Sequence, residues 1–133
     1  MAWCFEDETT DFTEAVLEGL AAGSTAIAPA LWPYEVANNL AVAERRNRTT
    51  FAHIVQFLAR LAKFPISIDP SDPQRMFGQV LRLAREHRLS VYDAAYLELA
   101  WRLDLPLATL DRDLRTAAKP EGVDLAYPRS SST

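Results

Sequence analysis

Short strand-like runs alternate with amphipathic segments along this chain, and that alternation restricts the fold more than any other feature. The runs lie at residues 24–29, 66–69, 106–109 and 123–127. Segments with helical spacing of apolar residues lie around them, at residues 10–22, 33–46, 50–63, 73–88, 90–102 and 112–118. Strands and helices in this order form a parallel sheet with helices on both faces. The sequence therefore predicts a three-layer α/β/α domain.

Two helical segments carry further expectations. Residues 50–63 place Phe51, Ile54, Val55 and Leu58 on one stripe, and we expect this helix to pair with residues 33–46 as a hairpin. Residues 90–102 are apolar almost all round, so this helix should be largely buried.

Size and composition indicate one globular domain. The chain has 133 residues, of which 49% are hydrophobic and 24% are charged, values typical of a folded domain. We assign residues 1–128 to that domain and expect residues 129–133, which contain no apolar side chain, to form a disordered tail. No run approaches the roughly 20 apolar residues of a membrane span. The single cysteine, Cys4, excludes an internal disulfide, which fits a cytoplasmic protein.

Charge and motifs exclude several functional classes. A net charge of −4 argues against nucleic-acid binding through overall positive potential, although an acidic metal pocket with a basic rim remains compatible with it. His53 and His87 lie on separate helices without metal-ligand spacing. No glycine-rich phosphate loop and no serine nucleophile elbow is present.

Three carboxylates are placed together by topology alone. Helices that cover a parallel sheet begin at its carboxyl edge, where ligands bind. Glu35 and Asp93 lie in first helical turns, and Asp111 directly follows the strand at residues 106–109. Such carboxylates repel one another unless a cation lies between them, and Mg²⁺ or Mn²⁺ prefers these oxygen ligands. We therefore predict a metal site.

Each acid also has a purely structural interpretation. Asp93 follows the cap residue Ser90 by three positions, as in a capping box. Asp111 is placed to cap the helix at residues 112–118, with Asp113 as its competitor for a functional role, and Glu35 suits the positive end of a helix dipole. A basic cluster at the tip of the predicted hairpin, with Arg45, Arg46 and Arg48, is either a solvated surface or a contact for RNA or a protein partner.

Three segments, in order, resemble the PIN-domain family and its VapC-type toxins. They are ALWPYEVAN at residues 30–38, LSVYDAAYLELA at residues 89–100 and LATLDRDL at residues 107–114. The resemblance implies Mg²⁺- or Mn²⁺-dependent RNA cleavage, inhibition by a cognate antitoxin, and a homodimer. It assigns the metal to Glu35, Asp93 and Asp111, and it makes Thr109 a residue that supports the site, with Asp113 beside it.

The resemblance also implies a departure at the N-terminus. In the family, a central first strand ending in aspartate precedes the segment matched here by residues 2–5, so we expect that strand to be missing and two half-sheets to remain. Glu6, Asp7, Glu8 and Asp11 lie too far along to replace the aspartate. A misassigned start, a strand supplied by another chain, or a decayed toxin would each explain this. The leading hypothesis is a type II toxin ribonuclease, and the alternative is an impaired protein that only binds the antitoxin.

Overall fold

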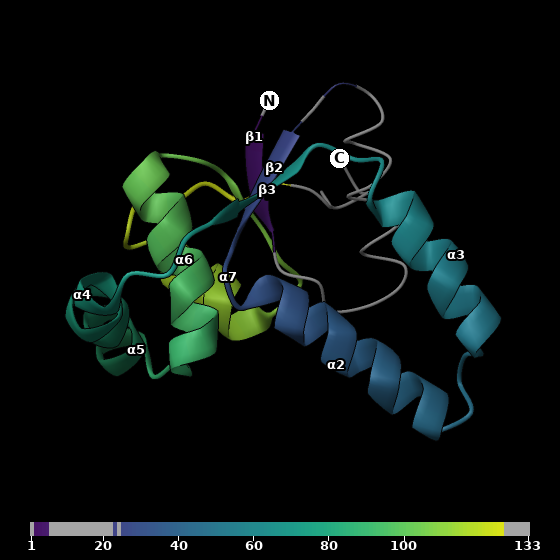
Figure 1. Cartoon of the computed structure of the whole chain (residues 1–133). Coiled ribbons are helices and arrows are strands. Elements are labelled where there is room, and N and C mark those ends of the chain that lie inside the picture. The colour runs from purple at the N-terminus through teal and green to yellow at the C-terminus, as the bar shows by residue number, and fades with distance from the viewer. Residues whose placement is uncertain (1, 6–22, 24, 127–133) are drawn as a thin grey trace, which may run out of the picture.

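Four parallel strands form the centre of the molecule in the computed structural model, which describes residues 2–5, 23 and 25–126. The strands are β1 (Ala2–Phe5), β2 (Thr25–Pro29), β3 (Ile66–Asp69) and β4 (Leu107–Ala108), in the order β3-β2-β1-β4. Figure 1 shows α5 and α6 on one side of the sheet and α3 on the other. The predicted three-layer α/β/α architecture is confirmed. The helix predicted at residues 10–22 and the tail at 129–133 lie outside the described residues.

The centre of the sheet differs from the expectation. Ala2–Phe5 pairs with β2 through Cys4 and Ile27, and with β4 through Cys4 and Leu107. The two predicted half-sheets are therefore wrong for this structure, because residues 2–5 take the central position and supply hydrogen bonds to both neighbours. Without them, both inner edges would expose unpaired backbone groups.

The strand predicted at residues 123–127 is reduced to one bridge among the described residues. Leu125 pairs with Leu107 in parallel, and the backbone N–H groups of Leu107 and Ala126 donate to Asp124 and Leu107 at 2.8 and 2.9 Å. Gly122 precedes this segment with a φ of 73°, a conformation that glycine adopts without strain.

Helices α2 (Trp32–Arg45) and α3 (Phe51–Leu61) occur where the pattern predicts them. They join at a turn in which Asn47 adopts a φ of 57°, and from there they diverge instead of packing side by side (Figure 1). The expected hairpin pairing is therefore wrong. Ile54 is buried, whereas Phe51 and Val55 remain 68% and 49% exposed because α2 does not cover that part of the stripe.

The helix predicted at residues 73–88 is present but interrupted. It consists of α4 (Pro73–Arg75), a π-helical turn η1 (Met76–Val80) and α5 (Leu81–His87). Asp72 caps its start by accepting a hydrogen bond from the Gln74 N–H at 2.9 Å, and Arg88 ends it with a φ of 55°. Gly78, a poor helix former, lies inside the π turn.

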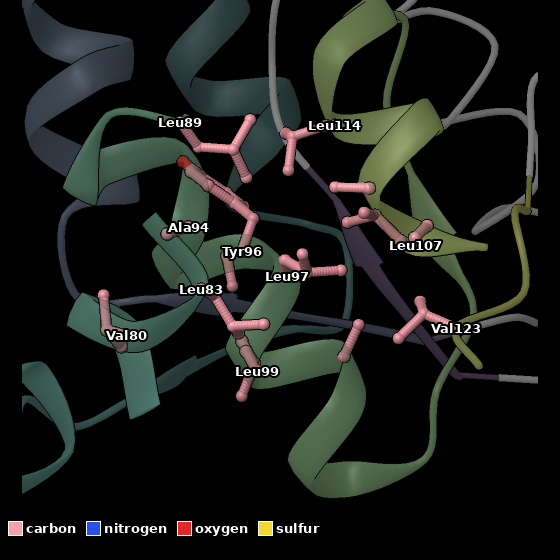
Figure 2. Close-up of a cluster of buried hydrophobic side chains, with 14 of the residues drawn as sticks. Val80, Leu83, Leu89, Ala94, Tyr96, Leu97, Leu99, Leu107, Leu114 and Val123 are labelled. Atoms are coloured by element: carbon pink, nitrogen blue, oxygen red, sulfur yellow. The ribbon is translucent and has the colours of Figure 1, made fainter. Parts of the chain in front are cut away.

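Helix α6 (Val91–Leu103) contacts β1, β2 and β4 and forms the middle of the core. Its residues 94 and 96–100 are all buried, as predicted. Figure 2 shows Leu97 and Leu99 of α6 among Leu83 of α5, Leu107 of β4 and Leu114 of helix α7 (Arg112–Ala118). No helix among the described residues combines the length and apolar character that crossing a membrane requires.

Replacing Leu97, which is fully buried, by alanine should leave a cavity at the centre of this core. We expect Leu97→Ala to lower the free energy of unfolding by about 2–5 kcal/mol. Urea denaturation measures this loss. Leu81, which is 41% exposed, provides the matched control, and Leu81→Ala should cost less than about 1 kcal/mol. Equal losses in the two variants would show that the core lies elsewhere.

Candidate functional site at the carboxyl edge of the sheet

The first turns of α2, α6 and α7 lie at the same edge of the sheet. Helices α2 and α7 directly follow β2 and β4, and α6 runs back across the sheet to its connection with β4. Figure 1 shows their N-terminal ends on one side of the strands. The topology thus places Glu35, Asp93 and Asp111 at the edge where the sequence predicts them.

Glu35 is tied to the core through a tyrosine on another helix. Its Oε1 accepts a hydrogen bond from the hydroxyl of Tyr96, which is fully buried on α6. Because the two residues lie 61 positions apart in the chain, this bond fixes the first turn of α2 against α6. Glu35 is half-buried, so it is not the solvated helix-dipole anion of the structural interpretation.

Asp93 leaves its carboxylate available. Ser90 caps α6, since its Oγ accepts from the Asp93 N–H at 3.0 Å. The reciprocal bond of a capping box, from the Ser90 N–H to the Asp93 carboxylate, is absent. Within the described part of the chain the Asp93 carboxylate accepts no hydrogen bond, although the side chain is half-buried. The cap explains Ser90 but not the acid.

Asp111 is both a cap and a fixed carboxylate. Its Oδ2 accepts from the Leu114 N–H at 2.9 Å, so the capping interpretation is confirmed. Its own N–H donates to Thr109 Oγ1 at 3.0 Å, and Thr109 is fully buried. The Thr109 carbonyl in turn accepts from Arg115 at 2.9 Å. Asp113, by contrast, is exposed.

The three acids face one edge but do not form a tight group. Among the described residues, only Glu86, His87 and Glu121 bring ligand atoms within 4.8 Å of one another. That group is an ion-pair network: His87 Nε2 lies 2.8 Å from Glu121, and Arg82 lies 3.0 Å from Glu86 and 3.6 Å from Glu121. The hydrogen bond to Glu86 raises the pKa of Arg82, which keeps a positive charge where a metal would bind.

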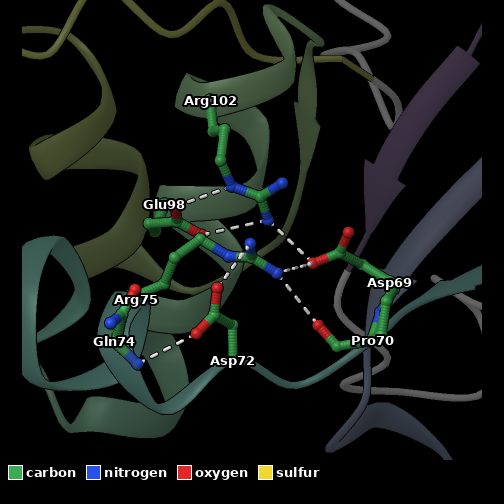
Figure 3. A network of polar contacts seen from close by, with 7 residues as sticks. All are labelled: Asp69, Pro70, Asp72, Gln74, Arg75, Glu98 and Arg102. Carbon is green, nitrogen blue, oxygen red and sulfur yellow. Dashed lines mark hydrogen bonds and ion pairs between the residues drawn. The ribbon is translucent and has the colours of Figure 1, made fainter.

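A second acidic group lies beyond the end of β3, and sequence reasoning missed it. Arg102 Nη2 bonds Asp69 at 2.7 Å and its Nε bonds Glu98 at 2.8 Å (Figure 3). Arg75 bonds Asp72 at 3.0 Å and lies 3.5 Å from Asp69. We call these five residues the Asp69 cluster. Two features of the sequence could have indicated this cluster: Asp69 at the end of a predicted strand, and Glu98 and Arg102 four residues apart on an apolar helix.

Burial makes the Arg102 pair costly to break. Glu98 is only 3% exposed. Burial lowers the pKa of Arg102, but hydrogen bonds to Glu98 and Asp69 outweigh this, so its pKa is raised. The guanidinium therefore stays charged and holds α6 against β3.

The basic cluster lies at the end of α2, away from this packing. Arg45, Arg46 and Arg48 are exposed around the turn at Asn47. In the described part of the chain none of the three forms an ion pair with a carboxylate. Their positive charge is thus available to a partner in solution.

Comparison with known proteins agrees with the fold and the sequence segments. A family model described as PIN domain matches residues 1–120. Ribonuclease VapC3 of Pyrobaculum aerophilum is 35% identical over 81 residues, which cover 61% of this chain and 62% of that protein. The crystal structure of PAE2754 from Pyrobaculum aerophilum superposes with a TM-score of 0.67 and 27% identity, covering 90% of this chain and 89% of the other.

The Asp69 cluster yields a stability prediction. We expect Arg102→Met to lower the free energy of unfolding by about 3–5 kcal/mol, because it leaves Glu98 buried without its partner. Arg82→Met, which removes an arginine with an exposed i,i+4 pair to Glu86, should cost less than about 1 kcal/mol. Urea denaturation of both variants tests this, and similar small losses would contradict it.

Proposed function

We propose that this chain, which belongs to the PIN-domain family, is a Mg²⁺- or Mn²⁺-dependent endoribonuclease of the toxin type. The observation that carries the proposal is the common edge at which α2, α6 and α7 begin: Glu35 and Asp93 lie in the first turns of α2 and α6, and Asp111 is the N-cap of α7. The similarity to ribonuclease VapC3 supports RNA as the substrate.

The donor set fits a hard divalent cation. All three candidate ligands offer carboxylate oxygens, the type that Mg²⁺ and Mn²⁺ prefer. Asp93 has both oxygens free of described partners, and Asp111 commits only Oδ2 to its cap. When bound, the cation supplies positive charge that lowers the pKa of a water and offsets charge on the phosphodiester.

The protein's own residues hold this arrangement in place. Tyr96 orients Glu35 from the core, and Thr109 fixes the backbone of Asp111. We assign Asp93 the central ligand position, because its half-buried carboxylate has no structural bond in the described chain. Asp113 stays a candidate for outer contacts with solvent or substrate.

The partners follow from the same proposal. We assign the free guanidinium groups of Arg45, Arg46 and Arg48 to RNA phosphates or to acidic residues of a cognate antitoxin. A homodimer would cover exposed apolar side chains such as Phe51 and Val55. We place the protein in the cytoplasm, where both RNA and a coexpressed antitoxin are accessible.

The decisive test removes one charge without changing shape. Asp93→Asn should abolish RNA cleavage by the full-length gene product, and excess EDTA should abolish cleavage by the wild type, because both remove the cation. Cleavage of labelled RNA on denaturing gels measures this. Activity that survives both treatments would refute the site and the cofactor. Strong antitoxin binding without Mg²⁺ or Mn²⁺ uptake in calorimetry would instead favour the binding-only alternative.

Asp111 permits its two roles to be separated. Asp111→Asn retains an oxygen that accepts from the Leu114 N–H, so its free energy of unfolding should lie within about 0.5 kcal/mol of the wild-type value. The same variant should lose most of its RNA cleavage. Asp111→Ala removes the cap as well and should cost about 0.5–2 kcal/mol. If Asp111→Asn cleaves RNA at the wild-type rate, Asp111 is a cap and nothing more.

A further inference from the structure

A cavity of about 250 Å³ opens where β2 and β3 end, at the edge of the sheet that also carries the proposed metal ligands. It opens between the β2–α2 connection, the β3–α4 connection and α6. Leu31, Val80 and Leu99 contribute apolar walls. The charged lining consists of the carboxylates of Asp69, Asp72 and Glu98 and the guanidinium of Arg75. Its volume is below the roughly 300–1,000 Å³ of pockets for drug-sized ligands, so it suits one small ring.

The cavity opens at the same edge of the sheet as the proposed catalytic residues, although Glu35, Asp93 and Asp111 do not line it. Tyr34 lines it and directly precedes Glu35, while Ala95 lines it two residues after Asp93. Tyr34 is 81% exposed, which leaves its ring free to stack on a planar group. An RNA bound at this edge of the sheet would bring a nucleotide beside the cleaved phosphodiester to this cavity.

The charges of the cavity select the chemistry of its occupant. In the Asp69 cluster three carboxylates meet two guanidinium groups, which leaves one net negative charge (Figure 3). All of the cluster except Arg102 lines the cavity. A phosphate would be repelled there. A planar ring that donates N–H groups fits both the carboxylates and the apolar walls.

We propose, building on the ribonuclease function above, that this cavity binds one unpaired RNA base with an exocyclic amino group. The base belongs to a nucleotide beside the cleaved phosphodiester. Tyr34 stacks on the ring, and the carboxylate of Asp69 or Asp72 accepts a hydrogen bond from the amino group. The protein thereby prefers guanosine, adenosine or cytidine over uridine at that position.

Nucleotide analogues test the amino group without altering the protein. Short single-stranded uridine RNAs with one central guanosine or one central inosine differ only in the 2-amino group. We expect the guanosine RNA to bind the uncleaving Asp93→Asn protein about tenfold more tightly, as one hydrogen bond to a charged group allows. Fluorescence anisotropy with Mg²⁺ present measures both dissociation constants. Equal constants would overturn the proposal.

Substitutions at Tyr34 locate the preference in this cavity. Tyr34→Ala should weaken binding of the guanosine RNA by about tenfold or more through lost stacking, whereas Tyr34→Phe, which keeps the ring, should restore it. Phe51→Ala removes another exposed aromatic ring, on α3 outside the cavity, and should leave the guanosine-to-inosine ratio unchanged. A Tyr34→Ala protein that keeps the wild-type ratio but binds its antitoxin more weakly would assign the cavity to a protein partner and overturn the proposal.

These readouts separate the two claims. Because binding is measured with an uncleaving protein, the base preference does not depend on catalysis. Wild-type cleavage with no guanosine preference would leave the ribonuclease intact and reject the base pocket. A guanosine preference without cleavage by the wild type would reject the catalytic function and retain the pocket.

Discussion

The burial of α6 is the constraint from which most of this structure follows. This helix contacts β1, β2 and β4 as well as α5 and η1, so its middle, at residues 94 and 96–100, is buried while its ends reach the surface. A helix in that position must satisfy its polar side chains internally. Glu98 does so through Arg102, which in turn bonds Asp69 at the end of β3. One buried acid thereby links the core helix to the edge strand.

The same helix organises the candidate site. Tyr96 presents its hydroxyl to Glu35, and Asp93 lies one turn earlier at the mouth of the sheet. On its other flank, Ala95 and Glu98 line the cavity beneath Tyr34. Core packing, proposed metal binding and proposed base binding thus depend on one helix. A rigid element of this kind fixes the relative positions of the groups that take part in a reaction. Substitutions along α6 should therefore rarely affect only one of these properties.

Local signals were sufficient to predict most elements and the position of the three acids. Pro33 and Ser90 mark where α2 and α6 begin, and the apolar character of residues 94–100 predicts that this part of α6 is buried. Long-range features were harder to predict. Nothing near Phe51 or Val55 indicates that α2 diverges from α3, because that angle is set by packing elsewhere. The π turn at Gly78 likewise leaves the apolar periodicity almost unchanged.

The site shows the same division. Capping by Ser90 and Asp111 was expected from spacing alone, whereas the Tyr96–Glu35 bond joins residues whose proximity depends on the whole fold. Asp69 was overlooked because its partner, Arg102, lies 33 positions away. The two half-sheets were predicted wrongly because backbone pairing by residues 2–5, which local sequence does not reveal, joins β2 and β4.

That pairing also sets the order of events during synthesis. Cys4 in β1 pairs with Leu107 in β4. One edge of the central strand therefore lacks its hydrogen-bonding partner until roughly one hundred further residues have been synthesised. At about 5–20 residues per second, the wait lasts several seconds to tens of seconds. Such non-local pairing slows folding and leaves a nascent sheet edge open to other chains. In this topology the edge of β1 that faces β4 therefore stays unpaired until β4 has been synthesised.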